Sequence, residues 1–205
     1  MPVTSLFSAT DRGMPNYRMR KMDQRPAALY PRLLGPAWLN LHAAIRSLHL
    51  TDDVATGRFE FHRGRSLAAR LVCRALRLPS SSTALEMQLA IARDAESERW
   101  TRTLGQRLLV TTQRGLPDGT LAERFGALEL RFHLHVVEGN LTYVQAGAGL
   151  MVGRLRIPLP RWIAPRVEAR EACVDGPGSY VRVGISAPGS GLVMSYEGCV
   201  QVKHP

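Results

Sequence analysis

The sequence has few cysteines and no long apolar run, and these absences exclude several classes of protein. Cys73, Cys173 and Cys199 are scattered and form no CxxC pair, which argues against a disulfide framework or a zinc site. No stretch approaches the roughly 18 uninterrupted apolar residues that a membrane span requires, and the N-terminus lacks the pattern of a signal peptide. We therefore expect a soluble, cytoplasmic protein without a membrane span.

Lysine is also scarce. Only Lys21 and Lys203 are lysines among the 27 basic residues, although the formal net charge is +10. The arginines are dispersed in a way that resembles a genome-wide codon preference more than a phosphate-binding surface. Their densest group, at 63–77, surrounds one expected helix and is typical of a solvated face. We expect no specific nucleic-acid partner.

Sequence motifs of common enzymes are missing as well. The chain has no GxSxG, HExxH or GK[ST] motif, so standard hydrolase and phosphate-loop chemistry has no support. GAGLMVG at 147–153 resembles a dinucleotide-binding loop, but RLRIPLP follows where that motif needs a helix, so it predicts a bulge or turn. His133 and His135 share an expected strand face with Glu129 and Arg131, which indicates solvent exposure, and no third ligand is marked. We expect no cofactor and no metal.

The 205 residues are 45% apolar and 21% charged, an ordinary balance for one globular domain. Few side chains of residues 1–26 could be buried, so this stretch is interpreted as a disordered, mildly basic leader. Residues 27–205 are then a single α+β domain.

Helical spacing of apolar residues predicts two main helices. One begins at Gly35-Pro36 and continues to about Leu50; the other runs from about Ser66 to Leu78 and ends at Pro79. The side chains expected to face the core are Trp38, Leu41, Ile45 and Leu48 in the first helix and Leu67, Leu71, Ala75 and Leu78 in the second.

From Thr83 onward the hydrophobic period is two, which predicts strands. The clearest tract is Leu128–Val136, in which every second residue is apolar, and 57–64 forms an earlier strand. About eight antiparallel strands joined by short turns would leave exposed edges if flat. We therefore predict N-terminal helices packed on a strongly curved antiparallel sheet or barrel.

Several polar residues lie in phase with the apolar face of these strands. Glu98, Trp100 and Arg102 share one face, Glu171 is in phase with Val167, and Tyr143 and Tyr196 have apolar neighbours in phase. An isolated buried charge is very costly, so the carboxylates need partners or a ligand. A polar pocket and a purely structural ion-pair network both satisfy this requirement.

Six blocks, in order, resemble the bacterial family catalogued as domain of unknown function 4166: LYPRLLGPAWLNLHAAIRSLH, RGRSLAARLVCRALRLP, ERWTRTLG, ERFGALELRF, IPLPRWIAPRVEAREA and LVMSYEG. The resemblance covers about residues 29–202. Leu104 stands where the family normally has phenylalanine. Some relatives carry this domain behind a saccharopine-dehydrogenase-like domain that this chain lacks, so no redox activity is implied. The recurring polar residues that the resemblance marks are Glu98, Trp100, Arg102, Glu123, Arg124, Glu171 and Tyr196.

The leading hypothesis is a pocket that binds a largely hydrophobic small molecule with a polar end. It could act as a cofactor-independent isomerase, cyclase or lyase, with a carboxylic acid of raised pKa as acid/base. The alternative is a non-enzymatic module that binds an oxidoreductase partner in trans. The candidate catalytic residues are Glu98, Arg102, Glu171 and Tyr196, and the candidate ligand-binding residues are Trp100, Glu123, Arg124, Leu130, Phe132, Leu134 and Tyr143.

The dispersed arginines generate the first testable prediction. Binding to a DNA duplex should be weak, independent of base sequence and lost steeply as salt is raised, because it would come from phosphate charge alone. Gel-shift titrations at two salt concentrations measure this. Tight, sequence-selective binding near physiological salt would contradict it.

Overall fold

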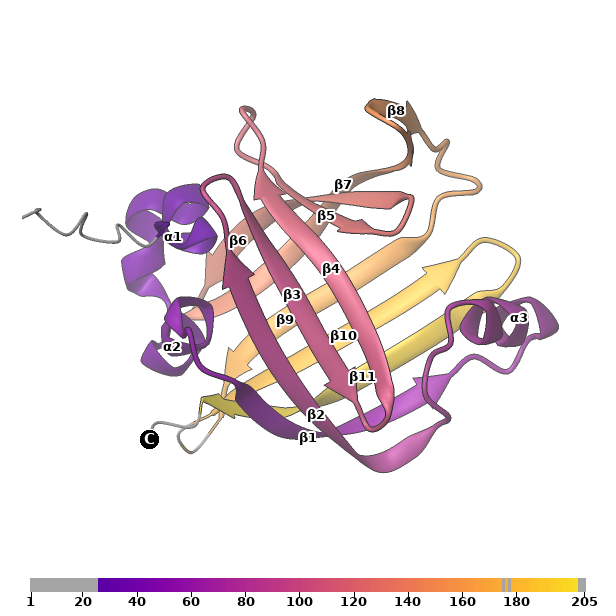
Figure 1. The fold of residues 1–205 in the computed structure, drawn as a ribbon, viewed down its shortest axis with the longest axis horizontal. Coiled ribbons are helices and arrows are strands. Elements are labelled where there is room, and N and C mark those ends of the chain that lie inside the picture. Colours follow the sequence, from indigo (N-terminus) through magenta and orange to yellow (C-terminus); the bar gives the residue numbers. More distant parts are fainter. Residues whose placement is uncertain (1–25, 175, 177, 203–205) are drawn as a thin grey trace, which may run out of the picture.

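The computed structural model describes residues 26–174, 176 and 178–202, so nearly all of the expected leader lies outside the described residues. Its main feature is an antiparallel sheet closed into a ten-stranded barrel, with a few helices at the two ends (Figure 1). The strands are β1 (Ala55–Arg63), β2 (Ser82–Arg93), β3 (Ser97–Leu104), β4 (Arg107–Gly115), β5 (Leu121–Phe125), β6 (Leu128–Val137), β7 (Asn140–Val152), β8 (Leu155–Pro158), β9 (Arg166–Cys173), β10 (Ser179–Ala187) and β11 (Gly191–Val202).

The barrel closes because the first and last strands pair with each other. Strand β1 lies between β2 and β11, and its register with β11 runs from Ala55 opposite Val202 to Arg63 opposite Met194. The remaining strands follow in chain order, except that β7 pairs with β6 on one side and with both β8 and β9 on the other. The short β8 pairs only with β7. It therefore extends from the barrel wall and is not one of the ten barrel strands.

The expected antiparallel sheet is present, but the expected number of about eight strands is too low. The tract 97–113 is two strands, because Gly105 takes a left-handed conformation (φ +58°) and turns the chain between β3 and β4. The five-residue β5 was not anticipated. Its sequence LAERF is too short and too polar to give a clear alternation.

Three short helical segments lie at one end of the barrel and a fourth lies at the other (Figure 1). The first end carries α1 (Leu29–Leu34), a 3-10 helix η1 (Gly35–Asn40) and α2 (Ala43–Leu50); the second carries α3 (Leu67–Ala75). The predicted continuous helix 36–50 is interrupted at Leu41 and His42, whose backbones are extended. The interruption lets the His42 N–H donate to the carbonyl of Gly139 in the β6–β7 turn at 3.0 Å.

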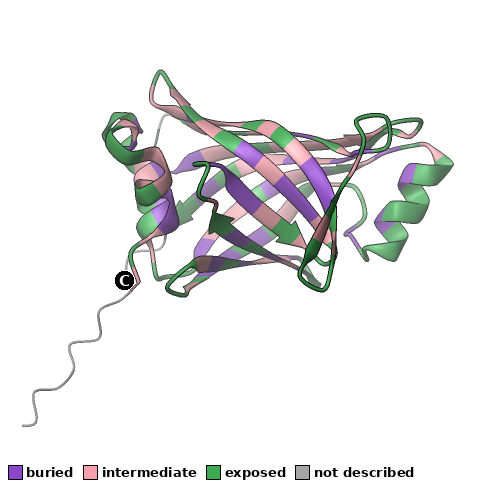
Figure 2. Ribbon diagram, turned by 90° about the horizontal axis from the view of Figure 1, so that it is seen from above, coloured by how far each residue is buried: buried purple, intermediate pink, exposed green. Residues whose placement is uncertain are grey.

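The second predicted helix forms, but it faces the opposite way. Leu67 and Leu71 are 77% and 67% exposed, whereas Ala69 and Cys73 are fully buried. The Cys73 thiol donates to the Val193 carbonyl of β11 at 3.3 Å. The fully buried side chains of α3 are small, Leu67 and Leu71 project outward, and Figure 2 shows α3 as mostly exposed.

Glu129 corrects another expectation, because it is 1% exposed and not solvated. It does lie in phase with the outward-facing residues of β6, but Arg114, Arg131 and Arg156 cover it, with nitrogen–oxygen distances of 3.0, 3.2 and 2.9 Å. Burial alone would raise the pKa of Glu129, but the arginines outweigh it and hold that pKa below its usual range.

The glycine cluster at 147–153 is explained by Arg156 and is no nucleotide loop. Most of it lies within β7, whose register with β6 shifts beside Gly147. A Cβ on Gly149 would lie 2.8 Å from the Arg156 guanidinium carbon. The missing side chain leaves room for Arg156, on β8, to lie across β7 toward Glu129.

Across residues 26–174, 176 and 178–202, no helix is long and apolar enough to cross a membrane. The same part of the chain holds no group of three or more His, Cys, Asp or Glu side chains arranged to bind a metal ion.

Barrel closure generates a prediction about the β1–β11 pairing. Gly57→Ala and Gly198→Ala should each destabilise the protein by about 1–3 kcal/mol, typical of overpacking. A Cβ there would lie 2.2 Å from the Cys199 carbonyl oxygen and 2.3 Å from that of Arg58, respectively. Thermal denaturation measures the effect. The matched control is Gly184→Ala in β10, where a Cβ meets nothing within 4 Å; equal losses in all three variants would contradict the close approach of β1 and β11.

Candidate functional site

The barrel interior contains a cavity of about 350 Å³. Most of its lining is apolar and comes from nearly every strand, with Val72, Leu76 and Leu78 contributed by α3 and the segment after it. This lining follows from the alternation of the strands, because closure turns one face of every strand inward. The polar residues that line it are Arg102, Thr111, Gln113, Glu123, Tyr143, Arg170, Glu171 and Tyr196.

An arginine–glutamate pair lines the cavity. A guanidinium nitrogen of Arg102 lies 3.5 Å from Glu123 Oε1, and another donates to Thr111 Oγ1 at 2.9 Å. The guanidinium carbon is 5.2 Å from the centre of the Trp100 ring, which favours the cation further. Burial alone would lower the pKa of Arg102, but Tyr196 and Glu123 outweigh it and raise that pKa. Arg102 is therefore a fixed positive charge at the cavity wall.

Tyr196 adds a hydroxyl to the cavity lining. Its ring is buried and lies 6.0 Å from that of Phe59. Among the described residues its hydroxyl has no hydrogen-bond partner. Burial raises its pKa, and although Arg102 opposes that effect, the hydroxyl stays protonated near neutral pH. It is available to donate to a molecule in the cavity.

A second polar cluster lies at the α1 and α2 end. Tyr143 donates to Glu171 Oε1 at 2.7 Å, and His49 Nε2 lies 2.9 Å from Glu171 Oε2. The Tyr30 hydroxyl donates to Gln113 Oε1 at 2.9 Å and lies 3.0 Å from the Tyr143 hydroxyl. Each of these five side chains has at least one polar partner, so residues from α1, α2, β4, β7 and β9 are joined in one buried network.

Within this cluster the negative charge is carried by the Glu171 carboxylate. Burial alone would raise the pKa of Glu171, but His49 and the Tyr143 hydroxyl outweigh it, so the pKa lies below its usual range. Burial and the nearby Glu171 carboxylate raise the pKa values of Tyr30 and Tyr143 well above their ordinary range. Glu171 therefore lacks the raised pKa that the acid/base hypothesis requires of its carboxylic acid. The carboxylate is ionised because its hydrogen-bond partners reach it from two elements.

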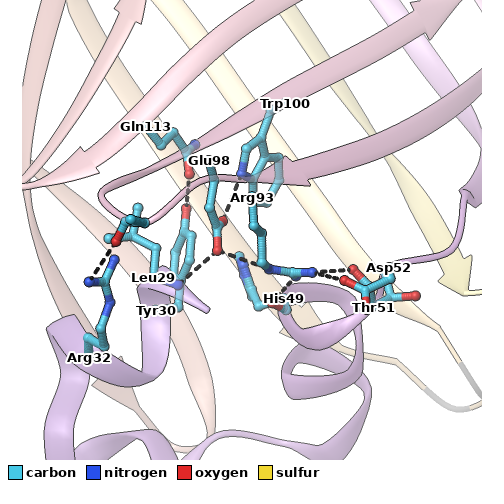
Figure 3. A network of polar contacts seen from close by, with 11 residues as sticks. Leu29, Tyr30, Arg32, His49, Thr51, Asp52, Arg93, Glu98, Trp100 and Gln113 are labelled. Carbon is cyan, nitrogen blue, oxygen red and sulfur yellow. Dashed lines mark hydrogen bonds and ion pairs between the residues drawn. The ribbon is translucent and has the colours of Figure 1, made fainter. Parts of the chain in front are cut away.

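Glu98 does not line the cavity and instead joins the helices to the barrel (Figure 3). Its Oε1 accepts from the backbone N–H of Leu29 at the start of α1 and from Arg93 Nε, at 2.8 and 3.3 Å. Its Oε2 accepts from Trp100 Nε1 at 3.1 Å. Arg93 also donates to the carbonyls of His49 and Thr51 at the end of α2. These contacts assign Glu98 a structural role.

The other predicted site residues divide into two groups. Arg124 is exposed and donates to the Gly126 carbonyl at 2.8 Å, and Leu134 packs against the core without lining the cavity. The alternation predicts that Leu130 and Phe132 face the interior, and both line the cavity. The part of β6 after Phe132 does not line the cavity. The predicted residues that line the cavity together are Trp100, Arg102, Glu123, Leu130, Phe132, Tyr143, Glu171 and Tyr196.

Sequence reasoning left out four residues of the polar clusters. Tyr30 and His49 lie in helices, where only their spacing beside apolar neighbours hinted at burial. Thr111 and Gln113 are in phase with the buried Leu109, and that alternation could have identified them. What the sequence did not reveal is that the helices supply side chains to the interior of the barrel.

Comparison with protein families assigns the chain to a group. The model of the family described as domain of unknown function 4166 matches residues 41–199. The chain belongs to this family. The match covers all ten barrel strands except the end of β11, and it includes every residue of the Arg102 and Glu171 clusters except Tyr30. A search of the curated proteins found no match to the chain.

The Glu171 cluster generates a prediction on pH. The pKa of Glu171 is lower in the folded state than in the unfolded state, so its contribution to stability is present above the ordinary glutamate pKa, about 4.3. That contribution is lost as the pH falls through the folded-state value. Glu171→Gln should therefore lower stability near neutral pH, by about 1–3 kcal/mol for a charged hydrogen bond, and should flatten the acid dependence.

Denaturant unfolding at a series of pH values measures both effects. Glu168→Gln is the matched control, since Glu168 is an exposed residue of the same strand. If both variants keep the wild-type acid dependence, Glu171 does not carry the proposed linkage.

Proposed function

We propose that this protein binds a largely hydrophobic small molecule whose polar end faces Arg102 and Tyr196. The single observation that carries the proposal is a mostly apolar cavity inside the barrel, with a fixed cation and a protonated hydroxyl on its wall. The size supports it too, because about 350 Å³ falls in the range of about 300–1,000 Å³ usual for ligand sites.

The distribution of polar groups favours one orientation of the ligand. The lining residues near α3 are apolar, among them Leu76, Phe125, Leu128 and Val193. Gln113, Tyr143 and Glu171 lie toward α1 and α2, where Tyr30 and His49 contact them. A ligand with a hydrophobic body and an anionic or carbonyl end would place the polar end inward and its body toward α3.

Binding alone is better supported than catalysis. A general acid or base works best when its pKa lies near the working pH. Here Glu171 has a lowered pKa, and Tyr143 and Tyr196 have raised ones, so each is moved away from neutrality. Both Glu171 oxygens are already occupied by His49 and Tyr143. We therefore propose a binding or carrier role and keep the isomerase, cyclase or lyase hypothesis as secondary.

Two fluorescent probes of similar hydrophobic body test the proposal. Both 1-anilinonaphthalene-8-sulfonate, which is anionic, and neutral N-phenyl-1-naphthylamine should bind with enhanced emission. Tyr196→Phe removes only a hydroxyl. It should weaken binding of the anionic probe by about tenfold, which corresponds to the loss of a hydrogen bond to a charged group, and should leave binding of the neutral probe unchanged. The double variant Arg102→Met with Glu123→Gln should do the same without leaving an unpaired charge.

Blocking the cavity provides the control for location. Val183→Phe places a larger side chain in the lining and should abolish binding of both probes, whereas Val144→Phe, at a half-exposed position outside the lining, should leave both unchanged. Near-UV circular dichroism confirms that each variant keeps its packing. Unchanged binding to Val183→Phe would place the probes elsewhere and would favour the rival hypothesis, a non-enzymatic module for an oxidoreductase partner.

A further inference from the structure

The two ends of the barrel differ sharply in charge. The connections at the α3 end are 64–81, 105–106, 126–127, 153–165 (which includes β8) and 188–190. They contain no Asp or Glu. The arginines exposed there are Arg65, Arg70, Arg74, Arg77, Arg154 and Arg161.

The acidic residues of the connections gather at the opposite end. The connections 51–54, 94–96, 116–120 and 138–139 all lie at the α1 and α2 end. Their acidic residues are Asp52, Asp53, Asp94, Glu96, Asp118 and Glu138. Among these connections, positive charge is therefore concentrated at the α3 end and negative charge at the α1 and α2 end.

The same α3 end exposes large apolar side chains. Isolated surface hydrophobic residues are ordinary, but a group of them on separate elements of one end marks an interaction site. Leu67 and Leu71 lie one turn apart on the outer face of α3, and Trp162 is 74% exposed in the connection that follows β8. The prominent members of this group are Leu67, Leu71, Leu108, Leu155, Trp162 and Leu192.

We propose that the α3 end of the barrel docks on the surface of an anionic lipid bilayer. Leucine and tryptophan side chains there would enter the boundary between headgroups and acyl chains, and the surrounding arginines would bind lipid phosphates. The absence of carboxylates from these loops removes the repulsion that an anionic surface would otherwise meet. Charge complementarity and the exposed apolar side chains thus both favour an anionic bilayer as the binding partner of this end.

A nucleic acid fits this end less well, although it is also anionic. Binding to phosphates uses arginine and lysine, and single strands add aromatic stacking, but exposed leucines on separate elements contribute nothing to either. An outward-facing leucine pair flanked by Arg70 and Arg74 is instead the arrangement of an interfacial amphipathic helix.

Docking in this way would also place the apolar part of the cavity next to lipid. Val72 in α3 and Leu76 directly after it are partly exposed residues that also line the cavity. A hydrophobic ligand could then pass between bilayer and barrel near α3. This consequence rests on the proposed function, whereas docking itself does not require a cavity ligand.

Vesicle binding tests the proposal directly. The full chain should co-sediment with vesicles of phosphatidylcholine and phosphatidylglycerol, and much less with phosphatidylcholine alone. Raising the salt from about 0.1 M to about 0.5 M should reduce binding several-fold, because it screens the arginines. Trp38 and Trp100 are buried, so a blue shift of tryptophan emission on binding reports that Trp162 has entered the bilayer.

Matched variants separate the α3 end from the rest of the surface. Leu67→Ser with Leu71→Ser should weaken vesicle binding on the order of tenfold through lost apolar burial, and Arg70→Glu with Arg74→Glu should weaken it at least as much. The controls lie at the other end: Leu39→Ser replaces a leucine that is 71% exposed, and Arg99→Glu reverses an exposed arginine. Neither should change binding.

Three results would overturn the docking proposal. The first is no binding to anionic vesicles; the second is equal loss of binding in the α3 variants and their controls. The third is binding to a DNA duplex that is tighter than vesicle binding and unaffected by the leucine substitutions, which would assign this end to nucleic acid. None of these results bears on the naphthalene probes, so failure here is distinguishable from failure of the cavity proposal.

Discussion

Closure of the sheet through the β1–β11 pairing constrains the rest of this structure. A strand has two faces, and closure makes one face of every strand interior and the other exterior. The interior face then holds whatever the alternation supplies, including Arg102, Glu123 and Glu171. These charges are retained because partners on neighbouring strands and on the helices reach them, as an isolated buried charge would be too costly. The two ends of the barrel remain to be covered, and the chain covers them in different ways.

At the α1 and α2 end, polar contacts hold the helices against the barrel. Glu98 holds the start of α1 and Arg93 holds the end of α2, while His49 reaches Glu171 inside the barrel. Carboxylates near a helix start and cations near a helix end match the helix dipole. These helices are too short to be stable alone, so their order depends on such contacts. The polar network in the cavity is therefore a product of the same interactions that close this end.

At the α3 end, the contact with the barrel is small and the remaining surface is apolar and basic. Arg63 donates to the carbonyls of Leu78 and Pro79, and Cys73 and Ala69 form the buried side of α3. Little apolar surface is buried there, so this end would open at a lower free-energy cost than the rest of the barrel. The cavity therefore lies between two unlike ends of the barrel: one is polar and tightly joined to the helices, and the other is apolar and lightly joined to α3.

The sequence by itself determined the antiparallel sheet, the inward phase of residues such as Phe132 and Trp100, and the family to which the chain belongs. Alternation is a local property, so it can be read along one strand. Only the tertiary structure decided which in-phase polar residues meet in the cavity: Glu171 does, whereas Glu98 serves α1. The position of each depends on strand tilt and on contacts between residues far apart in the sequence. The tertiary structure also decided that three arginines bury Glu129 and which face of α3 points outward. The sequence of a single strand or helix does not show which other elements pack against it.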